Sequence, residues 1–126
     1  MPRVSLAFFT AAALCGMAGM IWGVVMASSE DFTLSPAHAH LNLVGWATLA
    51  LMGIFYALAK AGGRLAWANF ALSAGGVAVM VPSLALYLQG SKPATLGLQI
   101  GTVLVILGML IFLVTVLSRW SKPAAA

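Results

Sequence analysis

The stretch ATLGLQIGTVLVILGMLIFLVTVL, which runs from Ala94 to Leu117, contains no charged side chain. A helix needs about 20 apolar residues to cross the hydrocarbon layer of a bilayer. This stretch is therefore long enough to span a membrane with some tilt. Three more charge-free stretches of similar length precede it, at about 4–27, 36–59 and 65–88. The sequence predicts four transmembrane helices.

The composition of the whole chain agrees with this interpretation. Of its 126 residues, 63% are apolar and only 6% are charged, and the mean hydropathy is +1.07. A soluble domain has roughly 25% charged residues, so this chain lacks the polar side chains that a water-facing surface needs. The composition excludes a nucleic-acid-binding domain and a P-loop nucleotide hydrolase. The single cysteine, Cys15, excludes an intramolecular disulfide.

The connections between the four stretches are short, and polar or glycine residues mark them at 28–31, 60–64 and 89–93. Helices joined by so few residues are antiparallel neighbours, so we expect an up-down-up-down bundle. The apolar run at 4–27 is longer than the roughly 7–15 residues of a signal-peptide core, and we interpret it as a helix of the bundle. Residues 1–126 are thus expected to form one all-α transmembrane domain.

Basic residues predict the orientation, because the cytoplasmic loops of membrane proteins carry an excess of Lys and Arg. One side of the bundle has Lys92 together with both acidic residues, Glu30 and Asp31. We therefore expect both termini in the cytoplasm and the protein in a bacterial inner membrane. The remaining basic residues all fall on the side of the termini: Arg3, Lys60, Arg64, Arg119 and Lys122.

Aromatic and small residues give two further expectations. Aromatic side chains favour membrane interfaces, which predicts Trp67 and Trp120 near the inner face and Trp22 near the outer face. Tyr56 and Tyr87 are also expected at the interfaces. Small residues four positions apart let helices approach closely. Three such pairs are predicted to form packing surfaces: Ala12 with Gly16, Gly19 with Gly23, and Gly97 with Gly101.

Both histidines of the chain lie in one segment, SPAHAHLNLVGW, from Ser35 to Trp46. Ser35 is a suitable N-cap and Pro36 suits the first helical position, so the histidines are expected in the first two turns of the second helix. Ionisable side chains within membrane helices are rare and mark functional sites by default. His38 and His40 differ by about 200° around a helix, so one helix does not bring both to the same metal ion.

The two histidines begin different stripes of the second helix. Asn42 and Gly45 follow on the His38 face, and Ala47 follows on the His40 face. Each small residue lies about two turns below its imidazole and leaves room for a flat, bulky ligand. The alternative is that both histidines only cap the start of the helix and contact lipid headgroups.

The segment His40-Leu41-Asn42-Leu43-Val44-Gly45-Trp46 resembles the second-helix segment of the large subunit of nitric oxide reductases and related haem–copper oxidases. In that family a His-x-Asn-Leu-x-x-Trp pattern supplies an axial ligand to the low-spin haem. His38-Ala39-His40 also resembles the His-x-His of a later helix, where the two histidines serve two haems. The resemblance implies one four-helix arc of a twelve-helix subunit, with haem b bound at His38, His40, Asn42, Gly45 and Trp46.

The chain also departs from that family. It has no further histidines for a copper centre, so we do not expect it to reduce oxygen or nitric oxide by itself. The resemblance favours a haem-binding protein that acts in electron transfer or small-gas binding with a redox partner. Four helices are too few to enclose a porphyrin, so His40 of one subunit is expected to face His38 of the next in a homo-oligomer. A trimer is favoured over a dimer, because the relatives have three arcs.

Two alternatives from other classes stay open. One is a copper- or haem-handling accessory protein of respiratory oxidase assembly, in which His38 and His40 act with methionines of the first helix. The other is a structural subunit of a larger membrane complex, for which the small-residue surfaces are the whole function. The methionines in question are Met17, Met20 and Met26.

Overall fold

The computed structural model describes residues 1–122, and all its regular elements within that range are helical. The last four residues of the predicted domain lie outside the described residues. The prediction of an all-α chain is confirmed for these residues. The helix ends differ from the predicted boundaries by three residues or fewer. Four helices in this range are long and apolar enough to cross a membrane: α1 (Arg3–Ser29), the second span (Ser35–Leu58), α4 (Arg64–Leu88) and α5 (Ala94–Trp120).

The second span is not a uniform α-helix. It begins with α2 (Ser35–His40), continues as the π-helix η1 (Leu41–Thr48) and ends as α3 (Leu49–Leu58). In η1 the wider turn brings position i beside the carbonyl of position i−5, and the Thr48 hydroxyl donates to the Leu43 carbonyl at 2.7 Å. Nothing in the sequence analysis predicted this segment. Departures of this kind inside α-helices are frequent at functional sites.

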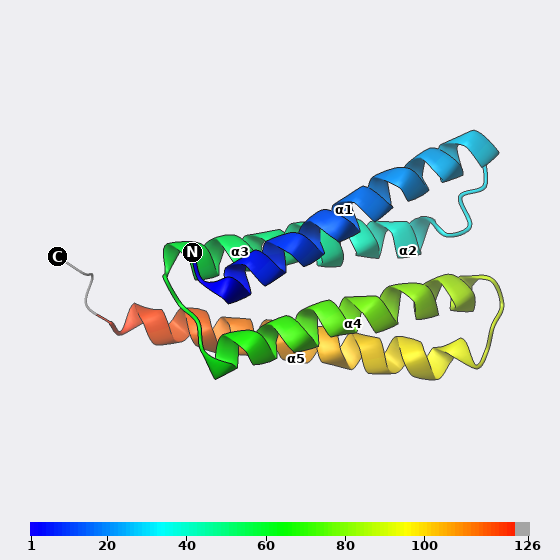
Figure 1. Cartoon of the computed structure of the whole chain (residues 1–126). Helices are drawn as coiled ribbons and strands as arrows, with labels where there is room; N and C mark the ends of the chain where they lie inside the picture. The colour runs from blue at the N-terminus through cyan, green and yellow to red at the C-terminus, as the bar shows by residue number, and fades with distance from the viewer. Residues whose placement is uncertain (123–126) are drawn as a thin grey trace.

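The helices form two antiparallel hairpins (Figure 1). In the first hairpin α1 packs along the second span, and in the second α4 packs along α5. The hairpins meet mainly through α4, which contacts both α1 and the second span. The start of α1 and the end of α5 lie at the same end of the bundle (Figure 1). Consecutive membrane spans run in opposite directions, as the short connections predicted.

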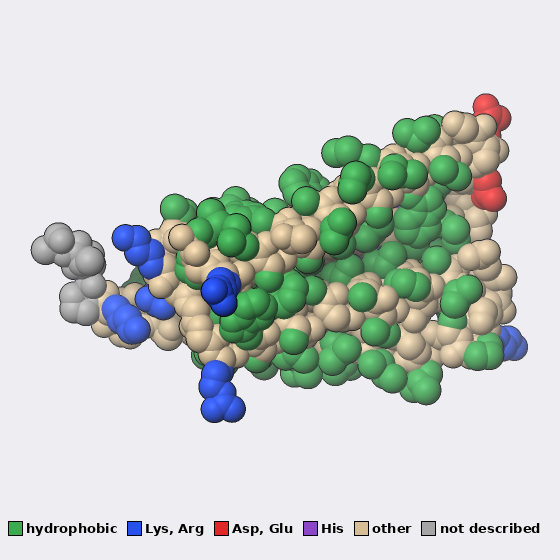
Figure 2. Space-filling view, in the orientation of Figure 1, with side chains coloured by type: hydrophobic (Ala, Val, Ile, Leu, Met, Phe, Trp, Pro, Cys, Tyr) green, Lys and Arg blue, Asp and Glu red, His purple; other side chains and the backbone are tan. Residues whose placement is uncertain are grey.

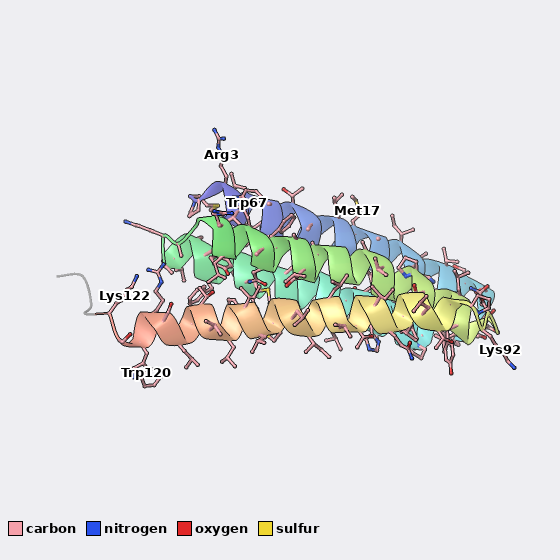
Figure 3. The ribbon with its side chains drawn as sticks, turned by 90° about the horizontal axis from the view of Figure 1, so that it is seen from below. Arg3, Met17, Trp67, Lys92, Trp120 and Lys122 are labelled. Atoms are coloured by element: carbon pink, nitrogen blue, oxygen red, sulfur yellow. The ribbon has the colours of Figure 1, made fainter. Side chains whose placement is uncertain are left out.

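Charged side chains gather at the two ends of the bundle, and apolar side chains cover the length between them (Figure 2). In Figure 3, Arg3 and Lys122 lie at one end together with Trp67 and Trp120. Lys92 lies at the opposite end. The structure therefore places the charges and these two tryptophans at the ends of the bundle that the sequence assigned to them.

Glycines hold the first hairpin together by leaving space for side chains. On the second span, Gly45 receives Cys15 of α1, whose Sγ would lie 2.9 Å from an added Cβ atom. The predicted packing role of the α1 glycines is confirmed. At three of them an added Cβ atom would meet a large side chain of the second span: Gly16 meets Trp46, Gly19 meets Asn42, and Gly23 meets His38.

Glycines also line the contact between the two helices of the second hairpin, and here the backbones of α4 and α5 lie close together. A Cβ atom on Gly101 would lie 2.5 Å from the backbone nitrogen of Met80. A Cβ atom on Gly76 would lie 2.8 Å from the backbone nitrogen of Val105. Backbone atoms cannot turn aside as a flexible side chain can, so these glycines set the distance between α4 and α5. Gly97 and Gly108 make room in the same way for Ser83 and Ser73.

A buried polar cluster joins the two hairpins. Asn69 Nδ2 donates to the Tyr56 hydroxyl at 3.0 Å, and the Ser73 hydroxyl donates to Asn69 Oδ1 at 2.9 Å. Tyr56, expected at a membrane interface, lies in the last turn of α3, and its side chain is fully buried inside the bundle. Its ring packs between Phe8 and Phe112, and Asn69 supplies the hydroxyl with a partner inside the bundle.

The start of the second span differs from the prediction by one residue. Leu34, and not Ser35, occupies the N-cap position, and its carbonyl accepts a hydrogen bond from the backbone N–H of His38 at 3.0 Å. In the loop before it, the hydroxyl and the backbone N–H of Thr33 donate to Asp31 Oδ1 at 2.6 and 3.0 Å. These hydrogen bonds hold the pKa of the Asp31 carboxyl below its ordinary value.

Candidate functional site

His38 lies in the groove between α1 and the second span. Its Nε2 atom is 3.0 Å from the carbonyl oxygen of Gly19, across the helix pair. The side-chain Nδ2 atom of Asn42 is 3.1 Å from the same nitrogen. The edge of the imidazole meets Trp22, with ring centroids 6.2 Å apart. His38 is therefore half-buried against its own chain.

The two neighbours of His38 Nε2 require different tautomers. The Gly19 carbonyl only accepts, so it pairs with a protonated Nε2, whereas the Asn42 amide Nδ2 only donates and pairs with an unprotonated one. In either tautomer Nε2 is used by a group of its own chain and is not free to bind a metal ion. In this arrangement Nε2 of His38 serves to join two helices, and the glycines at positions 19 and 23 provide the space that it needs.

His40 has the opposite environment. Its ring is exposed, and its Nδ1 atom lies 2.7 Å from the carbonyl oxygen of Pro36, one turn earlier in the same helix. By the same argument Nδ1 is the donor, so the lone pair of the imidazole is on Nε2 and points away from the helix backbone. A histidine held by such a backbone hydrogen bond has the tautomer and orientation that metal-ligating histidines show.

The other three predicted site residues lie in the first hairpin, and two of them share the His38 stripe. Asn42 and Trp46 follow His38 at successive turns, and they face Gly19 and Gly16 of α1. Trp46 is 44% exposed, so part of its ring is open to a ligand or to lipid. The space beside Gly45, expected to hold a ligand, is filled by the side chain of Cys15. The structure thus groups His38, Asn42 and Trp46, and it separates them from His40.

Two cavities lie between the hairpins. One, of about 310 Å³, is lined only by apolar side chains and Cys15, and it lies between α1, η1 and α4. The other, of about 250 Å³, lies between the second span, α4 and α5. Neither of these cavities is lined by a histidine. Among residues 1–122, no three side chains of His, Cys, Asp or Glu form a group that could hold a metal ion.

The polar cluster of Tyr56, Asn69 and Ser73 was missed by the sequence analysis. A signal for it was present, because Asn69 is a polar side chain deep within a charge-free stretch. Polar side chains within membrane helices face the bundle interior and pair with one another, which predicts a partner for Asn69. Its partners lie 13 residues before it and four residues after it, so only the structure identifies the full cluster.

Comparison of the chain with protein families, with curated proteins and with solved structures gives no match. Two features of the chain bear on its function: the exposed imidazole of His40, and the contact of His38 with α1, beside Asn42.

Proposed function

We propose that this chain is a multi-pass membrane protein that binds haem b through Nε2 of His40 and acts in electron transfer or in the binding of a small gas. The observation that carries the proposal is the hydrogen bond from Nδ1 of His40 to the Pro36 carbonyl, 2.7 Å long. It leaves an unprotonated, exposed Nε2 atom near the end of a membrane helix. Haem b suits this site because the chain has no Cys-x-x-Cys-His motif for covalent attachment.

Bound haem iron supplies one-electron chemistry or a coordination position for a gas. The side chains of this protein orient and shield the ligand. The Pro36 carbonyl holds the His40 ring in the required tautomer. Trp46 lies on the His38 stripe and packs against Gly16 of α1, so it supports the position of the span. Asn42 acts indirectly, through its contact with His38, by keeping the second span against α1.

The site needs a second copy of the chain, since one chain offers a single exposed imidazole. The predicted trimer requires His38 of one subunit to face His40 of the next, and it stays a prediction. His38 already has a partner in Gly19 of its own chain, and this observation supports the two-fold alternative. In that arrangement the His40 residues of two chains meet across the axis and share one haem.

Absorption spectroscopy of the purified protein, reconstituted with haem, tests this proposal. The wild-type chain should show a reduced spectrum with split α and β bands and about one haem per two chains. His40→Ala should lose the bound haem. His38→Ala is the matched control, because the substitution is the same and the residue is two positions away; it should keep the haem but unfold more easily.

Full haem occupancy in His40→Ala would contradict the proposal, as would a wild-type protein that takes up no haem. Equal loss from both variants would support the trimer, in which both histidines are ligands. One haem per chain in a monomeric detergent complex would overturn both forms of assembly.

A second candidate function is supported by the packing of the first hairpin. His38, Asn42 and Trp46 each pack against a glycine of α1. Helix packing is therefore a sufficient role for these three side chains, without a cofactor. This observation favours the structural-subunit alternative, in which the chain contributes helices to a larger membrane complex. The copper-handling alternative gains no such support, since Met17 and Met20 are exposed while Met26 is buried.

A further inference from the structure

The smaller cavity between the hairpins has polar groups in an otherwise apolar wall. Its volume is about 250 Å³. Two of the side chains around it, Thr48 and Ser73, carry hydroxyl groups, and they come from different hairpins. The larger cavity has no such groups. The lining residues are Val44, Thr48 and Met52 of the second span, Ser73 of α4, and Val105, Ile106 and Met109 of α5.

Both hydroxyl groups already donate a hydrogen bond within the protein. The Thr48 hydroxyl donates to the Leu43 carbonyl at 2.7 Å, and the Ser73 hydroxyl donates to Asn69 Oδ1 at 2.9 Å. A hydroxyl group has one proton to donate and two lone pairs that accept. A hydroxyl oxygen in this wall is therefore an acceptor, and a ligand that matches it must carry a donor.

The apolar side chains of the cavity wall favour an aromatic ring. Met52 and Met109 line the cavity from opposite hairpins. Thioether sulfur makes favourable contacts with the edges of aromatic rings, and methionine side chains adapt their shape to what they contact. An apolar cavity of about 150 Å³ is sufficient for benzene, so the present cavity is large enough for a substituted ring.

We propose that this cavity binds a membrane-soluble phenol, with its ring between Met52 and Met109 and its O–H donating to the Thr48 hydroxyl oxygen. A phenol combines the two properties that the wall requires: an apolar aromatic body, and a single strong donor. The site is independent of the haem proposal, because neither histidine lines the cavity. Thr48 also ends η1, so the π-helical segment connects the His40 turn with this cavity.

Fluorine NMR of the full chain in lipid nanodiscs tests the proposal with two probes that differ in one group. The first probe is 4-fluorophenol, which donates an O–H, and the second is 4-fluoroanisole, which does not. Empty nanodiscs give the partition of each probe into lipid. The protein should bind 4-fluorophenol saturably above that background. It should bind 4-fluoroanisole about fivefold more weakly, as expected for the loss of one hydrogen bond.

Thr48→Val removes one acceptor oxygen and should weaken 4-fluorophenol binding about fivefold while leaving 4-fluoroanisole unchanged. Thr102→Val is the matched control, since the Thr102 hydroxyl also donates to a helix carbonyl, that of Leu98, and Thr102 does not line the cavity. Equal affinity for the two probes, an equal effect of the two valine variants, or binding that never saturates would overturn the proposal.

Discussion

At the residue scale, Asn69 connects both hairpins through a single side chain. Its amide donates to Tyr56 on α3 and accepts from Ser73 one turn further along α4, and all three side chains are buried. In a bilayer there is no water to replace a lost partner, so a buried polar group that loses its partner is costly. The cluster is therefore expected to behave as a unit.

We predict that Tyr56→Phe and Asn69→Leu are not additive. Each alone should lower the free energy of unfolding by about 1–3 kcal/mol, because each leaves a buried group unpaired. The double variant should lose less than the sum of the two, since it removes both ends of one hydrogen bond. Unfolding in mixed detergent micelles, followed by circular dichroism, measures the three values.

Tyr87→Phe is the control for the loss of a tyrosine hydroxyl, because Tyr87 is 48% exposed. It should change the stability by less than about 0.5 kcal/mol. Additivity of Tyr56→Phe and Asn69→Leu within a similar margin would show that the contact between them contributes no coupling.

The candidate site was predictable in part at this scale. The sequence identified the histidines as the ionisable residues of the second span and separated their faces by helical geometry. It did not identify the carbonyl of Gly19 as the partner of His38, because that acceptor is a backbone atom 19 positions away. Backbone acceptors have no sequence signature. The sequence therefore predicted both histidines as ligands, with the axial-ligand motif at His40, and their hydrogen bonds separate the two.

At the scale of the helices, glycines determine how closely neighbours pack. We predict that Gly101→Ala lowers the free energy of unfolding by about 1–3 kcal/mol, because its methyl group would meet the backbone of Met80. Gly75→Ala is the matched control, since a Cβ atom there would meet nothing within 4 Å. It should leave stability unchanged or raise it by up to about 1 kcal/mol through helix propensity. Equal destabilisation of the two variants in the same detergent assay would contradict this account.

The ends of the helices were predicted well because charges, glycines and proline mark them in the sequence. The turn at Gly63 illustrates this: its φ of 94° lies in the left-handed region that favours glycine. The π-helix at Leu41–Thr48 was not predicted. The segment contacts α1 and α4, and hydropathy reports only that it is apolar.

At the scale of the whole molecule, the charges at the two ends of the bundle predict its orientation. We expect a reporter fused after Lys60 or after Lys122 to report the cytoplasm, because five of the six basic residues lie on that side. A fusion after Lys92 is the control and should report the periplasm. Alkaline phosphatase, active only when exported, and a fluorescent protein, active only when retained, provide opposite readouts.

A phosphatase signal from the Lys60 fusion would reverse the orientation. It would also move His38 and His40 to the cytoplasmic side, and with them the predicted haem site. The assignment of sides is the part of the whole-molecule prediction that depends on charge alone. How the two hairpins pack on each other depends on side-chain shape, which the sequence does not display.

The pairing of glycines with polar side chains in the first hairpin has a consequence for how the protein is made. His38 enters the bilayer after α1 has been synthesised, so the Gly19 carbonyl that lies beside its Nε2 is already present on α1. Asn42 follows, and its amide meets His38 on the same span. A nascent chain that lost the Gly19 contact would carry the imidazole into the bilayer without a partner on α1 during its own insertion.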